Sequence, residues 1–280
     1  MVAQKRVVAL ILSPRRLGNC EILVKEICRH LPCEHQLELI RLTEKKIRPC
    51  RGCYACLMGA GCPLEDDFSA VARALSEADA LVIASPTYFL GANGMLKVFL
   101  DRCLQLFAGD FDLRGKPALN LVTAGLRHEA GATEMMLNSF SLIMGLDIKA
   151  SEVFYGALPG EIFLDNPGQR VRAERLGKKL FAAEKREFAA WACPLCGCDV
   201  VQLQGGDRIQ CMVCRNYGRL VCDEGSFRME VELRPDNMFF TAEQAHQHGL
   251  WLRGMKERFL KLKKKLLSIC GAYADQGKWL

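Results

Sequence analysis

Five apolar runs alternate with four helical patterns over the first 156 residues, and this order leaves the chain few possible folds. The apolar runs cover residues 5–13, 35–42, 80–88, 116–125 and 147–156. The segments whose apolar residues recur at helical spacing are 18–31, 65–79, 94–107 and 131–146. Short connections between alternating strands and helices favour a parallel sheet with helices on both faces. The sequence therefore predicts an α/β domain with a doubly wound, five-stranded parallel sheet.

The loop after the first strand is suited to binding an anion. Such a flavodoxin-like sheet binds ligands beyond the carboxyl ends of its strands. There "SPRRLGN" (13–19) leads into a helix, whose first N–H groups and dipole attract negative charge. Ser13, Arg15 and Asn19 add polar donors, and Gly18 permits close approach of the backbone. No Walker or GxGxxG pattern occurs, so we expect a single phosphate; the alternative is an ordinary capped turn.

A second loop holds four cysteines, Cys50, Cys53, Cys56 and Cys62, with the spacing C-x2-C-x2-C-x5-C. Runs with two-residue spacings are typical of [4Fe–4S] sites, and three glycines in the loop allow the tight turns that wrapping a cluster requires. Structural zinc sites more often pair two near ligands with two distant ones. We therefore expect a [4Fe–4S] cluster, with zinc and free or redox-active thiols as alternatives.

A second cysteine set follows a change of composition near residue 191. Cys193-x2-Cys196 and Cys211-x2-Cys214 are fourteen residues apart, which is the spacing of a zinc ribbon. The sequence predicts a zinc site, with a rubredoxin-like iron site as the alternative. Either of two spare cysteines nearby, Cys198 and Cys222, could replace a named ligand.

Composition divides the chain into three segments: an α/β domain over 1–190, a ribbon-like module over 191–226, and a strand with a basic helix over 227–280. The net charge of +6 equals that of residues 251–265 alone, which hold seven basic residues and one glutamate. The predicted helix over 241–269 is amphipathic. Its basic face could simply be solvated, could dock an acidic redox protein, or could lie on a membrane surface or nucleic acid.

The cysteine count bears on the compartment. Fifteen cysteines in a chain without a membrane-spanning apolar run or a recognisable signal peptide argue for metal or redox sites in the reducing cytoplasm. We therefore expect a cytoplasmic protein rather than a disulfide-linked secreted one.

Three motifs, taken in order, resemble the iron–sulfur flavoproteins, which are FMN-binding relatives of NAD(P)H-dependent FMN and quinone reductases. They are the 13–19 loop, the four-cysteine loop running into Asp66-Asp67, and "SPTYFLGANGMLKVFLDR" (85–102). The resemblance covers residues 5–156 and implies FMN, with the phosphate held at the first loop. It also implies that the cysteine loop holds the cluster. The residues it assigns to FMN are Ser13, Arg15, Gly18, Asn19, Cys20, Pro86, Thr87, Tyr88, Phe89, Gly91, Thr123, Ala124 and Gly125.

At Cys20 the family usually carries Thr or Ser, and a thiol is a weaker hydrogen-bond donor than a hydroxyl. The resemblance also implies a homo-oligomer, either a dimer or a tetramer.

These features predict an electron-transfer flavoprotein that passes electrons between a ferredoxin-like carrier and a small acceptor. A cluster-free NAD(P)H-dependent FMN or quinone reductase is the alternative. A redox-sensing nucleic-acid-binding protein is an alternative of another class, although we do not expect nucleic acid as a partner. No side chain in the sequence stands out as an acid–base catalyst.

Overall fold

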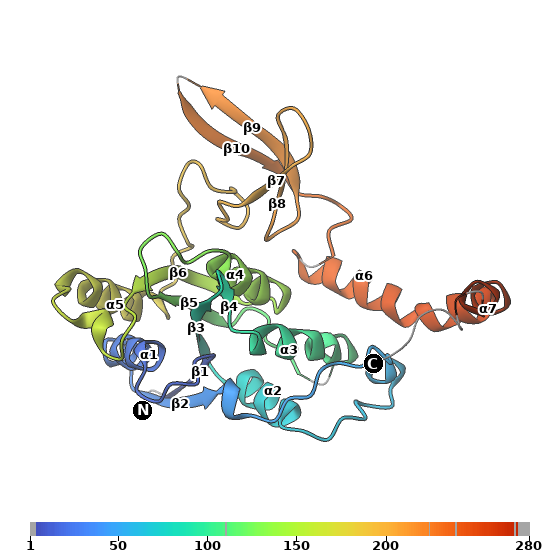
Figure 1. Cartoon of the computed structure of the whole chain (residues 1–280), viewed down its shortest axis with the longest axis horizontal. Coiled ribbons are helices and arrows are strands. Elements are labelled where there is room, and N and C mark those ends of the chain that lie inside the picture. Colours follow the sequence, from blue (N-terminus) through green and yellow to red (C-terminus); the bar gives the residue numbers. More distant parts are fainter. Residues whose placement is uncertain (1–3, 110, 224, 239, 272, 274–280) are drawn as a thin grey trace.

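The computed structural model describes residues 4–109, 111–223, 225–238, 240–271 and 273. Its larger sheet has five parallel strands in the order β2-β1-β3-β5-β6, which is the flavodoxin order and confirms the predicted fold (Figure 1). The strands are β1 (Lys5–Ile11), β2 (His35–Arg41), β3 (Ala80–Tyr88), β5 (Pro117–Ala124) and β6 (Asp147–Tyr155).

Helices cover both faces of this sheet because the central strands are apolar on both sides. Along β1, Val7, Ala9 and Ile11 belong to one core cluster, whereas Val8 and Leu10 belong to the other. The first cluster lies under α1 (Asn19–Arg29) and α5 (Pro167–Lys179). The second lies under α2 (Phe68–Glu77), α3 (Met95–Arg102) and α4 (Thr133–Ile143).

The loops at the edges of the sheet contain short secondary-structure elements. A two-residue strand, β4 (Gly91–Ala92), folds back antiparallel onto the end of β3. The 3-10 turns are η1 (Leu42–Glu44), η2 (Ala55–Met58), η3 (Cys103–Ala108) and η4 (Glu161–Phe163).

A second, antiparallel sheet forms the cysteine-rich module above α4 (Figure 1). Its strands are β7 (Val201–Leu203), β8 (Arg208–Cys211), β9 (Tyr217–Asp223) and β10 (Ser226–Glu232), in the order β10-β9-β8-β7. The sequence division at residue 226 separates β10 from this module, yet β10 pairs with β9 along its whole length. We therefore extend the module to Glu232.

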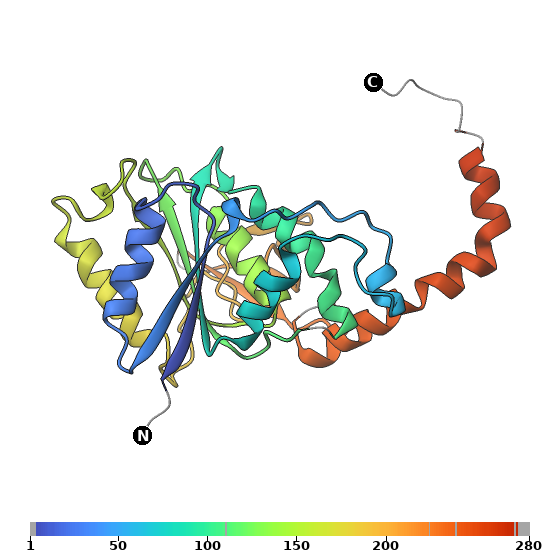
Figure 2. The ribbon, with the colours of Figure 1, turned by 90° about the horizontal axis from the view of Figure 1, so that it is seen from below.

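The C-terminal helical pattern is two helices rather than one. Helix α6 (Ala242–Arg253) begins with a capping box between Thr241 and Gln244, and α7 (Met255–Gly271) starts after Gly254. Helix α6 packs against η2, which lies within the first cysteine loop and contains Cys56, and against η3, which follows α3. Helix α7 projects away from the rest of the chain, and none of its described side chains is buried (Figure 2). Within the described ranges, no helix is long and apolar enough to cross a membrane.

Candidate cofactor sites

A cleft of about 180 Å³ opens at the carboxyl ends of β1, β3, β5 and β6, where the sequence predicts ligand binding. Nine of the thirteen residues assigned to FMN line it, together with two residues after β6. The lining residues are Ser13, Arg15, Asn19, Cys20, Pro86, Thr87, Tyr88, Thr123, Gly125, Gly156 and Ala157. Cavities for whole drug-sized ligands measure about 300–1,000 Å³, so a bound flavin would extend beyond this cleft.

The loop after β1 leaves the N-terminus of α1 open toward an anion. No side chain caps α1 at Gly18, and a Cβ at that position would lie 2.9 Å from the Cβ of Arg15. The backbone of Ser13 and Arg15 is held by Arg41, whose Nη1 donates to both carbonyl oxygens at 2.9 Å. Arg41 belongs to no motif that the sequence analysis identified, so its role in this loop was not predicted. An uncapped helix N-terminus beside a braced loop fits a phosphate group.

The side chain of Asn19, which the sequence analysis assigned to FMN, forms hydrogen bonds within the protein instead. Its side-chain Nδ2 donates to the carbonyl oxygen of Gly156 at 2.7 Å, and its Oδ1 accepts from the N–H of Gly160 at 3.0 Å. The amide therefore ties α1 to the loop after β6 and shapes the cleft wall. Arg15 uses one nitrogen on the carbonyl oxygen of Ala157 (2.9 Å) and keeps an exposed side chain beside the cleft.

Cys20 lies at the floor of the cleft and is 1% exposed. Its Sγ is 3.2 Å from Oγ1 of Thr123, so the thiol takes the position of a hydroxyl in a hydrogen-bonded pair. Burial raises the pKa of the Cys20 thiol to about 12, which keeps it neutral at physiological pH. The cleft floor is therefore uncharged.

Phe89 departs from the sequence expectation. Phe89 and Leu90 form the tip of the β3–β4 hairpin with φ of 48° and 61°, a left-handed conformation that normally favours Asn or Gly. The Phe89 ring is fully exposed, and it does not line the cleft. Three further residues assigned to FMN do not line the cleft either: Gly18, Gly91 and Ala124.

The first cysteine loop gathers all four of its cysteines around one small cavity. Cys50 and Cys53 are exposed, whereas Cys56 and Cys62 are half-buried. As predicted from the sequence, the three glycines of the loop, Gly52, Gly59 and Gly61, all have positive φ. Four cysteines that line one cavity in a glycine-turned loop fit a metal cluster, which needs four thiolate ligands.

Arg102 packs under this loop, with its side chain 1% exposed. Its Nη1 donates to Oδ2 of Asp66 at 2.5 Å, its Nη2 lies 3.4 Å from Sγ of Cys62, and its guanidinium stacks 4.7 Å above the Phe68 ring. Burial alone would raise the pKa of the Asp66 carboxyl, but hydrogen bonds from Arg102 and from two backbone amides hold it below its ordinary value. Asp66 thus anchors the loop, and its Oδ1 also accepts the N–H of Phe68, the first residue of α2, at 3.0 Å.

The second cysteine set converges more tightly. The sulfurs of Cys193, Cys196, Cys211 and Cys214 all lie within 4.8 Å of one another, and all four belong to or border the module's core. The Cys193–Cys214 and Cys196–Cys211 sulfur distances are 3.7 and 3.5 Å. A tetrahedral site with metal–sulfur bonds of about 2.3 Å has sulfur–sulfur edges of about 3.8 Å. The set therefore fits one tetrahedral metal ion.

The two spare cysteines lie outside this set. Cys198 is buried beside it, but its Sγ interacts with the backbone of Val200 at 3.3–3.4 Å. Cys222 is exposed on β9.

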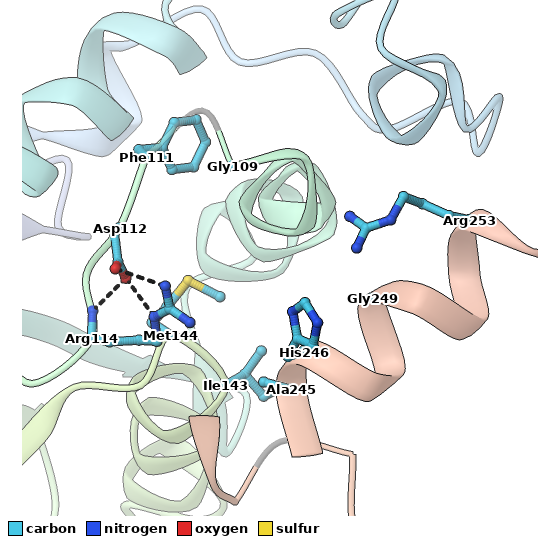
Figure 3. A pocket seen from close by; sticks show the side chains of 10 residues that line it. All are labelled: Gly109, Phe111, Asp112, Arg114, Ile143, Met144, Ala245, His246, Gly249 and Arg253. Carbon is cyan, nitrogen blue, oxygen red and sulfur yellow. Dashed lines mark hydrogen bonds and ion pairs between the residues drawn. The ribbon is translucent and has the colours of Figure 1, made fainter. Parts of the chain in front are cut away.

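A further cavity of about 440 Å³ separates α6 from the sheet domain (Figure 3). His246 and Arg253 line this cavity from α6, and Asp112 on the opposite side is paired with Arg114 at 2.8 Å. None of the residues assigned to a cofactor lines this cavity.

The chain is similar to known flavoproteins and reductases. Residues 5–157 match the family model described as NADPH-dependent FMN reductase. An iron–sulfur flavoprotein of Methanocaldococcus jannaschii is 32% identical over 186 residues, which cover 62% of this chain and 95% of that protein. A flavone synthase of Aspergillus candidus is 25% identical over 242 residues, covering 74% of this chain and 75% of that protein.

A solved structure of a flavone reductase covers 98% of this chain and 99% of its own, with a TM-score of 0.72 and 17% sequence identity. The fold is thus shared over nearly the whole length, including the cysteine-rich module and the C-terminal helices. The family match covers more than half of the chain and supports FMN as its cofactor. The chain belongs to the NADPH-dependent FMN reductase family, as an iron–sulfur flavoprotein with an appended zinc-ribbon-like module, and it is a flavin-dependent oxidoreductase.

Proposed function

We propose that the chain transfers electrons between a one-electron carrier and a small acceptor, through a [4Fe–4S] cluster at Cys50, Cys53, Cys56 and Cys62 and FMN in the cleft. The observation that carries this proposal is the convergence of the four loop cysteines around one cavity on a domain with a flavin cleft. FMN exchanges one or two electrons and a cluster exchanges one, so the pair links the two kinds of chemistry.

The residues of this chain have distinct parts in that function. The N-terminus of α1, Ser13 and Arg15 hold the phosphate, while Pro86 and Tyr88 offer a flat apolar wall to the ring. The neutral Cys20–Thr123 pair supplies hydrogen-bonding groups without charge at the floor. Zinc in the second cysteine set stabilises the ribbon-like module, which is too small to fold on its own core.

A ferredoxin-like protein is the proposed carrier. The basic side chains of α7 are all exposed, and they carry a charge complementary to an acidic carrier. A homo-oligomer is also part of the proposal, because Phe89 at the mouth of the cleft is fully exposed and lacks a covering surface within the described chain.

The test is cofactor analysis with anaerobic reduction kinetics. Protein purified without oxygen should hold about four iron and about four sulfide per chain in addition to FMN and one zinc. The Cys56→Ser variant should lose iron but keep FMN and zinc, and reduced ferredoxin should then bleach the flavin absorbance at least tenfold more slowly. Cys33→Ser, in the loop between α1 and β2, is the matched control and should behave as wild type.

A second candidate is an NAD(P)H-dependent reductase of a planar aromatic acceptor, without a cluster. The sequence likeness to a flavone synthase over 242 residues and the aromatic hairpin at the cleft mouth favour it. In that case wild-type protein would contain no iron, and NADPH would reduce the flavin faster than ferredoxin does. These results would contradict the cluster proposal.

A further inference from the structure

Two buried side chains beside the first cysteine loop keep an N–H group without an acceptor. Arg102 and Gln105 are 2% and 4% exposed, and both line the cavity that the four loop cysteines surround. Among the described residues, neither Nε of Arg102 nor Nε2 of Gln105 has a hydrogen-bond partner. The two residues come from the end of α3 and from η3, so one short segment delivers both donors to the cavity.

Unpaired donors of this kind call for an acceptor. A buried donor without a partner costs about 1–3 kcal/mol, and folded proteins leave few of them. The rest of the Arg102 guanidinium is already fixed, because Nη1 contacts Asp66 and the carbonyl oxygen of Arg48 at 2.5 and 3.0 Å. Its Nη2 lies 3.4 Å from Sγ of Cys62. The guanidinium is therefore held in one position, facing the cysteines.

An acceptor lying among the thiols would satisfy both donors. A cluster brings sulfide and thiolate sulfurs, which accept N–H hydrogen bonds. The cation Arg102 and the neutral amide Gln105 would both stabilise negative charge on those sulfurs. Reduction adds one negative charge to a cluster, so each donor stabilises the reduced form more than the oxidised form.

We propose that Arg102 and Gln105 donate hydrogen bonds to the sulfur atoms of the group held by the loop cysteines, and that they raise its reduction potential. Both act as positioning residues, and neither is a ligand. This inference rests on the proposed function, because it requires a cluster in the loop.

The experiment compares three variants purified under argon: Arg102→Lys, Gln105→Leu and Arg172→Lys. Lysine at 102 keeps the charge but removes the planar fork, and leucine at 105 removes the amide at similar size. Arg172 is the matched control, since it also pairs with a carboxylate (Glu152, 2.9 Å) and stacks on a ring (Phe154, 4.4 Å), away from the cysteine loop.

The readout is the midpoint potential of the cluster, from a dithionite titration followed by electron paramagnetic resonance, with iron and sulfide counted in each sample. We expect each test variant to keep its iron and to shift the one-electron equilibrium at least tenfold toward the oxidised cluster. That shift equals a potential lower by about 59 mV for a one-electron couple. Arg172→Lys should match wild type.

Three results would overturn the inference. Wild-type potentials in Arg102→Lys and Gln105→Leu at full iron content would reject it and leave the proposed function standing. Loss of iron from Gln105→Leu with an unchanged circular dichroism spectrum would mean that the side chain retains the group rather than tuning it. Wild-type protein without iron and sulfide would reject both the inference and the proposed function. If Arg102→Lys alone loses iron, loss of the contact between residue 102 and Asp66 accounts for it. The cluster potential of Gln105→Leu then decides whether the inference holds.

Discussion

Sγ of Cys20 and Oγ1 of Thr123 lie 3.2 Å apart and join the first turn of α1 to the end of β5. The pKa of this thiol is about 12 because the side chain is buried, whereas its ordinary value is 9.0. A raised pKa means that the unfolded chain loses its proton first as the pH rises. Burial of the neutral thiol therefore makes no pH-dependent demand below about pH 9, and the free energy of unfolding falls as the pH rises from 9 to 12, because only the unfolded chain has released this proton.

In the Cys20→Ser variant, the free energy of unfolding should consequently decrease less steeply as the pH rises above 9. Serine keeps a hydrogen-bonding group but does not ionise in this range, so the variant loses about 1.4 kcal/mol less per pH unit above pH 9. Urea unfolding at pH 8, 9, 10 and 11 measures the slope. Cys222→Ser, on the exposed face of β9, is the control. Parallel slopes for wild type and Cys20→Ser would contradict the assignment.

The buried ion pair between Arg102 and Asp66 predicts a large effect of removing one partner. Asp66→Ala should lower the free energy of unfolding by about 3–5 kcal/mol, because it leaves the Arg102 charge buried and uncompensated. Asp112→Ala, which breaks the exposed pair with Arg114, should change it by less than about 1 kcal/mol. Chemical denaturation at pH 7 measures both values.

The same pair predicts a dependence on acid pH. The pKa of Asp66 is held below its ordinary 3.8, so its contribution is fully present above that value and disappears as the pH falls through the lower, folded pKa. The difference in unfolding free energy between wild type and Asp66→Ala should therefore become smaller only below about pH 4. A gap that closes already at pH 6 would point to another titrating group.

The close approach of the four sulfurs in the second cysteine set predicts which thiols bind a metal ion. Cys214→Ser should abolish binding of the single metal ion in the ribbon-like module and should make residues within 193–232 sensitive to limited proteolysis. The flavin should stay bound, since the cleft lies in the other sheet domain. Cys198→Ser should keep the metal, because that sulfur interacts with Val200 instead. Elemental analysis of both variants decides, and equal metal loss would make Cys198 a ligand.

The left-handed tip of the β3–β4 hairpin predicts a stabilising substitution. Phe89→Asn replaces a ring at φ 48° with a residue that tolerates this conformation, so in the monomeric chain, where the ring is fully exposed, it should raise stability by about 1 kcal/mol. Phe227→Asn, at an exposed position of β10, should lower stability because asparagine fits strands poorly. Thermal unfolding of the two variants should give shifts of opposite sign.

The sequence was sufficient for the sheet and for much of the cleft, because both depend on local rules. Apolar runs buried on two faces specify parallel strands, and the carboxyl-end rule brings Ser13, Thr87 and Thr123 to one edge. The same rule points to Gly156, which follows the fifth strand, although the sequence analysis did not use it there.

Other features depend on contacts between distant segments and leave little local signal. Arg102 stands in a quoted motif and Asp66 in another, yet nothing in either motif shows that they form one buried pair. The exposed position of Phe89 depends on the pairing of β4 with β3, which places this residue at the tip of a hairpin. The break at Gly254 was missed because the apolar pattern continues across it.

The packing of α6 against η2 and η3 has a consequence for the order of assembly during translation. The cysteine loop leaves the ribosome long before α6 is synthesised, and domains fold as they emerge. Through that interval α6 is not yet packed against the loop. If the proposed cluster is inserted at this stage, its iron and sulfide carriers would reach the cysteines before α6 restricts their access.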